Sequence, residues 1–486
     1  MKNFAHIIIN FIIVFIFHYD SDSWFISDSL TLFDQRISHD YWSYVFLHWD
    51  AHFMPLYRIF YDIEFQVFGI NFLLFSIVSY MLQAFYGFSF YIWICEIGII
   101  KRNAYLLSLI VLTAINSVTL IYWHVAQGII MYGFLSFFSL YFIEKYIKNS
   151  KNMFYLCVAV FLSSISALTC AEGILTPFYS SAYYMIRKQS LIDYRTYVKS
   201  FAFFIISFSP YLILSKICFP MEDSLALYWE PILKLRFFTV GLVNGILYQF
   251  PFVKYCIPEV VCYPIMIIFI YIISVIIKRS TPEYKRLIVS LILLILMTIG
   301  AVSLGRQNHG VYHAIKPFYF YFIFPVFLAI LAIVFQKSSF LNKKLWKRFL
   351  VLRILVFTIL IYNFLGIRIV HDKYWNRCAL VLRTHKIQLD ELITKSFIEK
   401  KVVLPNLKLS PFFGKMGLKS YIALFHETKL SHFKFVSLKD FSNPNFEVET
   451  METQYIEWNR TTYNSYSSEI WVTYLNKKMT KNKHIK

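Results

Sequence analysis

The sequence predicts an all-α polytopic membrane protein with about eleven transmembrane helices, within a range of about nine to thirteen, and a small C-terminal domain outside the membrane. Of the 486 residues, 58% are hydrophobic and 20% are aromatic, and the mean hydropathy is +0.54. These values lie outside the usual range for soluble globular domains. Apolar runs of about 20 residues recur along the chain, and each is long enough to cross a hydrocarbon core of about 30 Å.

Lysine and arginine gather in the short loops between the apolar runs, and this distribution sets the topology. A formal net charge of +20 would suggest a nucleic-acid partner in a soluble protein. In a membrane protein, basic loops instead mark the cytoplasmic side. We therefore expect no nucleic-acid partner, a cytoplasmic N-terminus and an outer C-terminus. High use of Ile, Phe, Lys and Asn favours an AT-rich genome, and hence a bacterial inner membrane.

The expected spans follow from taking the lysine-rich loops as cytoplasmic. In chain order they cover 5–18, 68–99, 104–122, a span ending before Lys145, one ending near Thr169, one ending before Arg187, 200–219, 259–277, 287–304, one ending before Lys337, and 349–367. Residues 236–250 are interrupted by glycine and polar residues, so we place them in the outer interface or in a re-entrant segment.

The last part of the chain differs in character from the rest. Residues 368–486 carry charges throughout and contain no apolar run of spanning length, and 432–438 and 471–474 are weak strand candidates. We expect a transmembrane module over 1–367, whose first outer loop is 19–67, and an extracytoplasmic domain of α/β character over 368–486.

The first outer loop is unusually acidic. It holds six aspartates before residue 58, in a chain with only 28 carboxylates: Asp20, Asp22, Asp28, Asp34, Asp40 and Asp50. His48 and His52 are four residues apart, so on a helix they would share one face and could hold a divalent metal; a structural histidine is the alternative. No third ligand is fixed by the spacing, and we predict no metal and no cofactor. The seven cysteines form no CxxC pair, which argues against a zinc ribbon.

Other polar groups fall on the same outer face. Pro55 predicts a helix start, with Arg58 one turn later, where it would either snorkel to the interface or bind an anion. Glu172 follows an apolar span and would either cap the next helix or face the site. Arg306 and Lys316 flank an outer loop, where they would either anchor a span end or bind a phosphate. Ionisable groups that converge on one membrane face are typical of a functional site.

Four short motifs resemble the GT-C class of membrane glycosyltransferases, which includes the aminoarabinose transferase and the protein O-mannosyltransferases. They are Asp20-Ser21-Asp22-Ser23-Trp24, His52-Phe53-Met54-Pro55-Leu56-Tyr57-Arg58, Ser166-Ala167-Leu168-Thr169-Cys170-Ala171-Glu172-Gly173 and Leu304-Gly305-Arg306. They spread over about residues 1–367, the expected transmembrane module. Nothing in the chain matches the WWD-type motif of oligosaccharyltransferases, which argues against the N-glycosylating branch.

The resemblance implies transfer of a sugar from a polyprenyl-phosphate donor to a lipid, glycan or protein acceptor on the outer side of the membrane. Asp22, with Asp20 next, would deprotonate the acceptor hydroxyl. His52, Arg58, Arg306 and Lys316 would contact the donor or its phosphate, and Glu172 would position the acceptor.

Two other functions remain open from the sequence. A polysaccharide polymerase or ligase would rely on outer arginines and a large late loop, whereas the large loop here is the first one. A transporter would carry charges midway along its spans and an internal repeat. The expected spans carry few charges, and we find no repeat between the two halves.

Overall fold

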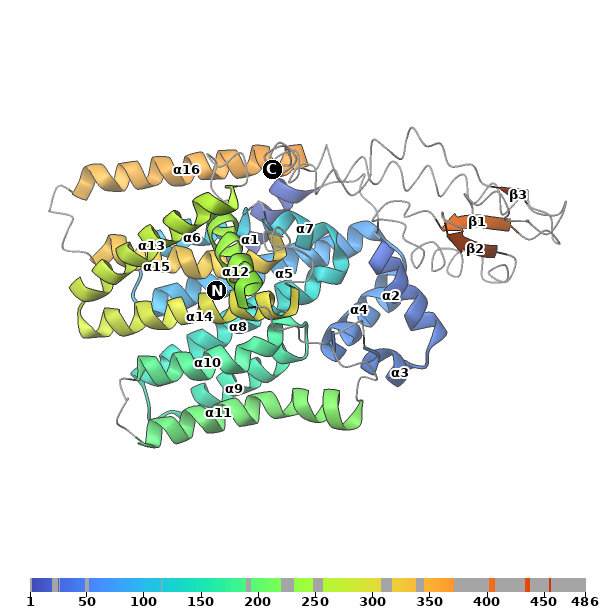
Figure 1. Ribbon diagram of the computed structural model, residues 1–486, viewed down its shortest axis with the longest axis horizontal. Helices are drawn as coiled ribbons and strands as arrows, with labels where there is room; N and C mark the ends of the chain where they lie inside the picture. Colours follow the sequence, from blue (N-terminus) through green and yellow to red (C-terminus); the bar gives the residue numbers. More distant parts are fainter. Residues whose placement is uncertain are drawn as a thin grey trace.

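The computed structural model describes most of the first 370 residues and three short strands beyond them. The described residues are 2–19, 25, 27–48, 52–114, 116–188, 194–219, 231–247, 257–306, 317–337, 345–370, 402–406, 433–437 and 454–455. Most of them are helical (Figure 1).

The helices follow one another with short connections. They are α1 (Lys2–His18), α2 (Ser27–Ser38), α3 (Tyr41–Phe46), α4 (Pro55–Phe68), α5 (Phe72–Glu96), α6 (Lys101–Leu112), α7 (Asn116–Tyr122), α8 (Gln127–Lys148), α9 (Met153–Ala167), α10 (Leu175–Arg187), α11 (Tyr194–Leu212), α12 (Pro231–Leu247), α13 (Glu259–Arg279), α14 (Pro282–Arg306), α15 (Ile323–Lys337) and α16 (Leu345–Val370). Short 3-10 turns η1 (His124–Ala126), η2 (Glu172–Ile174) and η6 (Pro317–Phe320) precede α8, α10 and α15, and a π-helical turn η3 (Ile213–Cys218) extends α11.

Several of these helices identify the chain as a membrane-embedded protein. Within the described residues, five helices are long and apolar enough to cross a membrane: Phe72–Glu96, His124–Lys148, Tyr194–Cys218, Glu259–Arg279 and Pro282–Leu304. Shorter apolar helices cover Phe4–His18, Met153–Ala167, Ile323–Val334 and Val356–Arg368. Each of them overlaps a span expected from the sequence.

The third expected span, 104–122, is not one helix. It breaks between α6 and α7, where Thr113 ends α6 and its side chain donates to the Leu109 carbonyl at 2.8 Å. The buried Gln83 of α5 donates to the Leu112 carbonyl at 3.2 Å, which supplies a partner that the broken helix lacks. A break in the buried core needs such a partner, because a buried carbonyl without one is costly.

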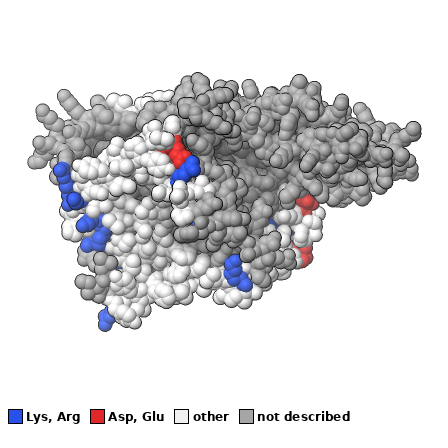
Figure 2. All heavy atoms as spheres, in the orientation of Figure 1, with Lys and Arg blue, Asp and Glu red and all other residues white. Residues whose placement is uncertain are grey.

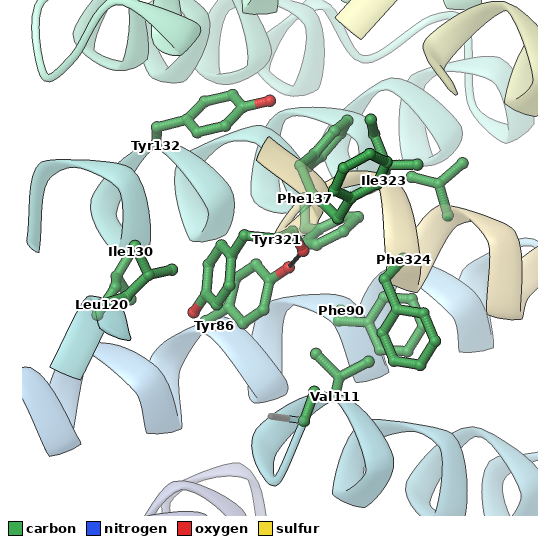
Figure 3. Packing of buried hydrophobic residues seen from close by; sticks show 14 of the residues in the cluster. Tyr86, Phe90, Val111, Leu120, Ile130, Tyr132, Phe137, Tyr321, Ile323 and Phe324 are labelled. Carbon is green, nitrogen blue, oxygen red and sulfur yellow. Dashed lines mark hydrogen bonds between the residues drawn. The ribbon is translucent and has the colours of Figure 1, made fainter. Parts of the chain in front are cut away.

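Aromatic side chains fill the centre of the bundle (Figure 3). Tyr86 of α5 and Tyr321, just before α15, stack with ring centroids 4.2 Å apart, and the Tyr86 hydroxyl donates to the Tyr321 carbonyl at 2.5 Å. Gly133 of α8 permits this packing, because a Cβ there would lie 2.6 Å from the Tyr86 ring. The core therefore joins α5, α8 and the start of α15.

The helix ends fall into two groups. At one end, which we call the basic end, Lys148 and Lys145 of α8 pair with Glu96 of α5 at 2.7 and 3.0 Å. Lys199 of α11 donates to the Tyr146 hydroxyl there, at 3.0 Å. At the opposite end, which we call the α4 end, the Leu56 amide donates to the Leu168 carbonyl at 3.1 Å. This grouping matches the alternation expected from the basic loops.

The three strands form a parallel sheet in the order β2-β1-β3, with β1 at Val402–Asn406, β2 at Phe433–Ser437 and β3 at Gln454–Tyr455. β2 lies within the strand candidate 432–438, whereas the candidate 471–474 lies outside the described residues. Parallel neighbours need crossover connections, which is typical of α/β domains.

Candidate functional site

The structure describes part of the site expected from the sequence. Asp20, Asp22 and Lys316 lie outside the described residues, and Arg306 ends α14 with its side chain outside the described part. His52, Arg58 and Glu172 are described. These three lie at the α4 end of the bundle, and the bond between Leu56 and Leu168 ties the start of α4 to the turn before Glu172.

Helix α4 begins at Pro55, as the sequence predicts, because proline lacks the amide that a first helical turn leaves unpaired. The helix is held against its neighbours by tyrosine hydroxyls. Tyr57 donates to the His124 carbonyl at 2.5 Å, and Tyr61 donates to the Ser29 carbonyl at 3.0 Å. The first of these bonds fixes α4 to the start of α8, and the second fixes it to α2.

The two histidines do not share a helix face. α3 ends at Phe46, and both His48 and His52 lie outside helices, so they lack the shared helix face on which the metal alternative depended. His48 Nε2 instead donates to the Phe219 carbonyl, at 2.8 Å, beyond the end of α11. Among the described residues, no three His, Cys, Asp or Glu side chains come together in a group that could hold a metal ion.

Arg58 is fully buried and does not snorkel to the surface. Its guanidinium lies 4.9 Å from the centre of the Tyr44 ring, and Nη2 donates to Gln35 Oε1 at 3.1 Å. Nε and Nη1 have no acceptor among the described residues. Burial lowers the pKa of Arg58, because the charged form is the one that loses solvation.

Two carboxylates on the same helix have different surroundings. Asp62 pairs with Arg36 of α2. Glu64 is buried, accepts a bond from Gln127 Nε2 at 3.2 Å, and has an Oε2 without a partner. Burial raises the pKa of Glu64 well above its ordinary value of 4.5. Glu64 was not predicted as a site residue, because the sequence of α4 alone does not reveal that Glu64 faces the bundle.

Glu172 opens the turn η2 that leads into α10 but is not its capping residue. The preceding position is Ala171, and no side chain caps the turn. Gly173 beside it is packed so closely that a Cβ would lie 1.9 Å from the Ser166 carbonyl oxygen. Glu172 is half-buried and lies in the first turn, where a helix dipole favours a negative charge.

A long apolar groove runs along the bundle from this site. Its volume is about 1010 Å³, and its walls come from α4, α8, α9 and α11. Leu56, Ile59, Phe60 and Ile63 of α4 form the wall at the α4 end. Among the described residues that line it, Lys199 is the one charged side chain, and it lies at the basic end. The groove thus offers an apolar chain a path between the two ends.

Searches against family models, curated proteins and solved structures find no match to this chain.

Proposed function

We propose that this protein is a membrane glycosyltransferase of the GT-C class, which moves a sugar from a polyprenyl-phosphate donor to a lipid, glycan or protein acceptor at the α4 end. The observation that carries the proposal is the groove. One wall of it is formed by α4, which begins within the His52 to Arg58 motif and contributes Leu56 of that motif, so a lipid tail in the groove would place its phosphate beside the motif.

The chemistry of the groove suits a prenyl chain. Its described lining is apolar except for Cys157, Ser164 and Lys199, and burial of apolar surface there would contribute roughly 25 cal/mol per Å². A polyprenyl tail offers only hydrocarbon, so it leaves no polar group unpaired along this path. The reacting groups then remain at the end of the groove, outside the hydrocarbon.

In the proposed reaction Asp22 accepts the proton of the acceptor hydroxyl, the acceptor oxygen attacks the anomeric carbon, and the bond between that carbon and the phosphate oxygen breaks. His52, Arg306 and Lys316 stabilise the charge on the departing phosphate, and Glu172 positions the acceptor. Arg58 joins them only when the donor reaches behind Tyr44, because its free N–H groups are buried in the present arrangement. The proposal needs no resident cofactor.

The assignment is tested by Asp22→Asn. We expect this variant to lose sugar transfer from a lipid-linked donor while its abundance in the membrane is unchanged. Asp40→Asn is the matched control, because Asp40 caps α3 through the Ser43 amide at 3.1 Å and asparagine caps equally well. Full transfer by Asp22→Asn, or substrate flux in sealed vesicles without any lipid-linked sugar, would refute the proposal and favour a transporter.

The role of the groove is tested separately by filling it. Ala202 of α11 lines the groove, whereas the neighbouring Ile205 does not and is exposed. We expect Ala202→Trp to raise the KM for the lipid-linked donor by about tenfold or more. Burial of one methylene group contributes about 1 kcal/mol, and a side chain that blocks the groove prevents the burial of several such groups. Ile205→Trp should leave KM unchanged. Equal effects of the two variants on KM would contradict the proposed binding of the lipid tail in the groove.

A further inference from the structure

The short helix α3 presents an aromatic face to its surroundings. Trp42 is 61% exposed, although tryptophan carries a large apolar surface, while Tyr44 and Val45 on the other face are buried. Phe46 lies one turn after Trp42, and the two rings stack with centroids 5.9 Å apart and planes 16° apart. Trp42 and Phe46 therefore pack against each other on the exposed face of α3.

This face continues into a membrane-spanning helix. Phe46 stacks on Phe219 with ring centroids 4.1 Å apart and planes 9° apart, and Phe219 follows the turn η3 that ends the candidate span Tyr194–Cys218. Figure 1 shows α3 beside that end of α11. The span itself exposes apolar side chains here, with Ile217 at 73% and Ile213 at 47%. The exposed apolar side chains of the span are thus joined to α3 through the stacked Phe46 and Phe219, and the exposed Lys216 and Ser43 lie among them.

Polar groups border the aromatic face on one side. Ser38, His39 and Asp40 are exposed directly before Trp42, and Asp40 caps the helix. On the described surface seen in Figure 2, Asp and Glu are sparse, and most of the visible Lys and Arg lie along the left edge. An aromatic side chain between a hydrocarbon band and polar residues is the arrangement found in the headgroup layer of a bilayer.

We infer that α3 is a membrane-surface anchor, with Trp42 and Phe46 in the interfacial layer of the bilayer beside the outer end of α11. The partner is the lipid itself, and continuity with the exposed band of the span is what identifies it. The anchor fixes α2 and α4 as well, because the Tyr44 ring on the inner face of α3 packs against Arg36 of α2 and Arg58 of α4. This inference does not depend on the proposed transferase activity.

The test is a nitroxide label at Trp42→Cys in nanodiscs, in a background where all cysteines except the buried Cys170 and Cys262 are serine. We expect the label at position 42 to be more accessible to oxygen than to a nickel chelate, as for a reference label at Ile217→Cys. A label at His39→Cys should show the opposite preference. Equal chelate access at 42 and 39 would overturn the inference, and so would a short distance between two labels at 42, which would assign the face to a second copy.

A second measurement uses the unmodified protein and so does not depend on folding of a variant. Hydroxyl-radical footprinting in nanodiscs should leave Trp42 protected from oxidation, despite its exposure in the isolated chain. Oxidation of Trp42 to the extent expected of a solvated tryptophan would also contradict the inference that α3 is a membrane anchor.

Discussion

Glu64 is the buried carboxyl group that most directly links pH to stability. Because burial raises its pKa above the ordinary 4.5, the folded state keeps a proton that the unfolded state loses. Stability therefore falls as the pH rises above about 4.5, by roughly 1.4 kcal/mol for each pKa unit of difference. Glutamine mimics the protonated acid, so we expect Glu64→Gln to raise the thermal midpoint at about pH 7 and to have no effect at about pH 4.

The matched control for this substitution is on the same helix. Asp62 pairs with Arg36, so Asp62→Asn removes an ion pair and should lower the midpoint at neutral pH. Thermal unfolding of both variants over about pH 4 to 8 tests whether Glu64→Gln raises the midpoint at neutral pH and Asp62→Asn lowers it. A loss of stability in Glu64→Gln at neutral pH would show that Glu64 is ionised in the folded protein.

For Arg58 we expect a different effect of substitution on stability, because two of its N–H groups are buried without acceptors among the described residues. An unsatisfied buried donor costs about 1–3 kcal/mol, so packing alone does not favour arginine at this position. We expect Arg58→Met, which keeps an unbranched stem but removes the guanidinium, to match or exceed the thermal stability of the parent and to lose sugar transfer. A large fall in stability would show instead that the stacking on Tyr44 and the bond to Gln35 are what the residue provides.

At the scale of elements, the contact between α8 and α10 rests on a buried ion pair. Arg187 Nε and Nη2 donate to the two oxygens of Glu144 at 2.6 and 3.0 Å, and the Tyr183 hydroxyl donates to the same carboxylate at 2.6 Å. Arg187→Met would leave Glu144 as an unpaired buried charge, at a cost of about 3–5 kcal/mol. We expect the double variant Arg187→Met, Glu144→Gln to recover most of this loss in thermal unfolding. Additive losses in the double variant would contradict the pairing.

Elements with a strong local signal were predictable, and those set by tertiary partners were not. Pro55 marks the start of α4 in the sequence because its effect acts within one turn. The break after Thr113 depends on Gln83 of another helix, and the burial of Arg58 depends on α2 and α3. The i, i+4 spacing of His48 and His52 had meaning only if a helix continued through them. The candidate site could accordingly be located at one end of the bundle, while the environment of each side chain could not.

At the scale of the whole molecule, the sidedness of the bundle is open to a direct test. Asn149 lies at the basic end, after Lys148, and His39 lies at the α4 end; both are exposed. With every native cysteine except the buried Cys170 and Cys262 replaced by serine, a membrane-impermeant maleimide applied to intact cells should label His39→Cys. Asn149→Cys should react only after permeabilisation, because basic loops stay in the cytoplasm. Labelling of Asn149→Cys in intact cells would invert the topology and place the α4 end, with the groove's proposed catalytic side, in the cytoplasm.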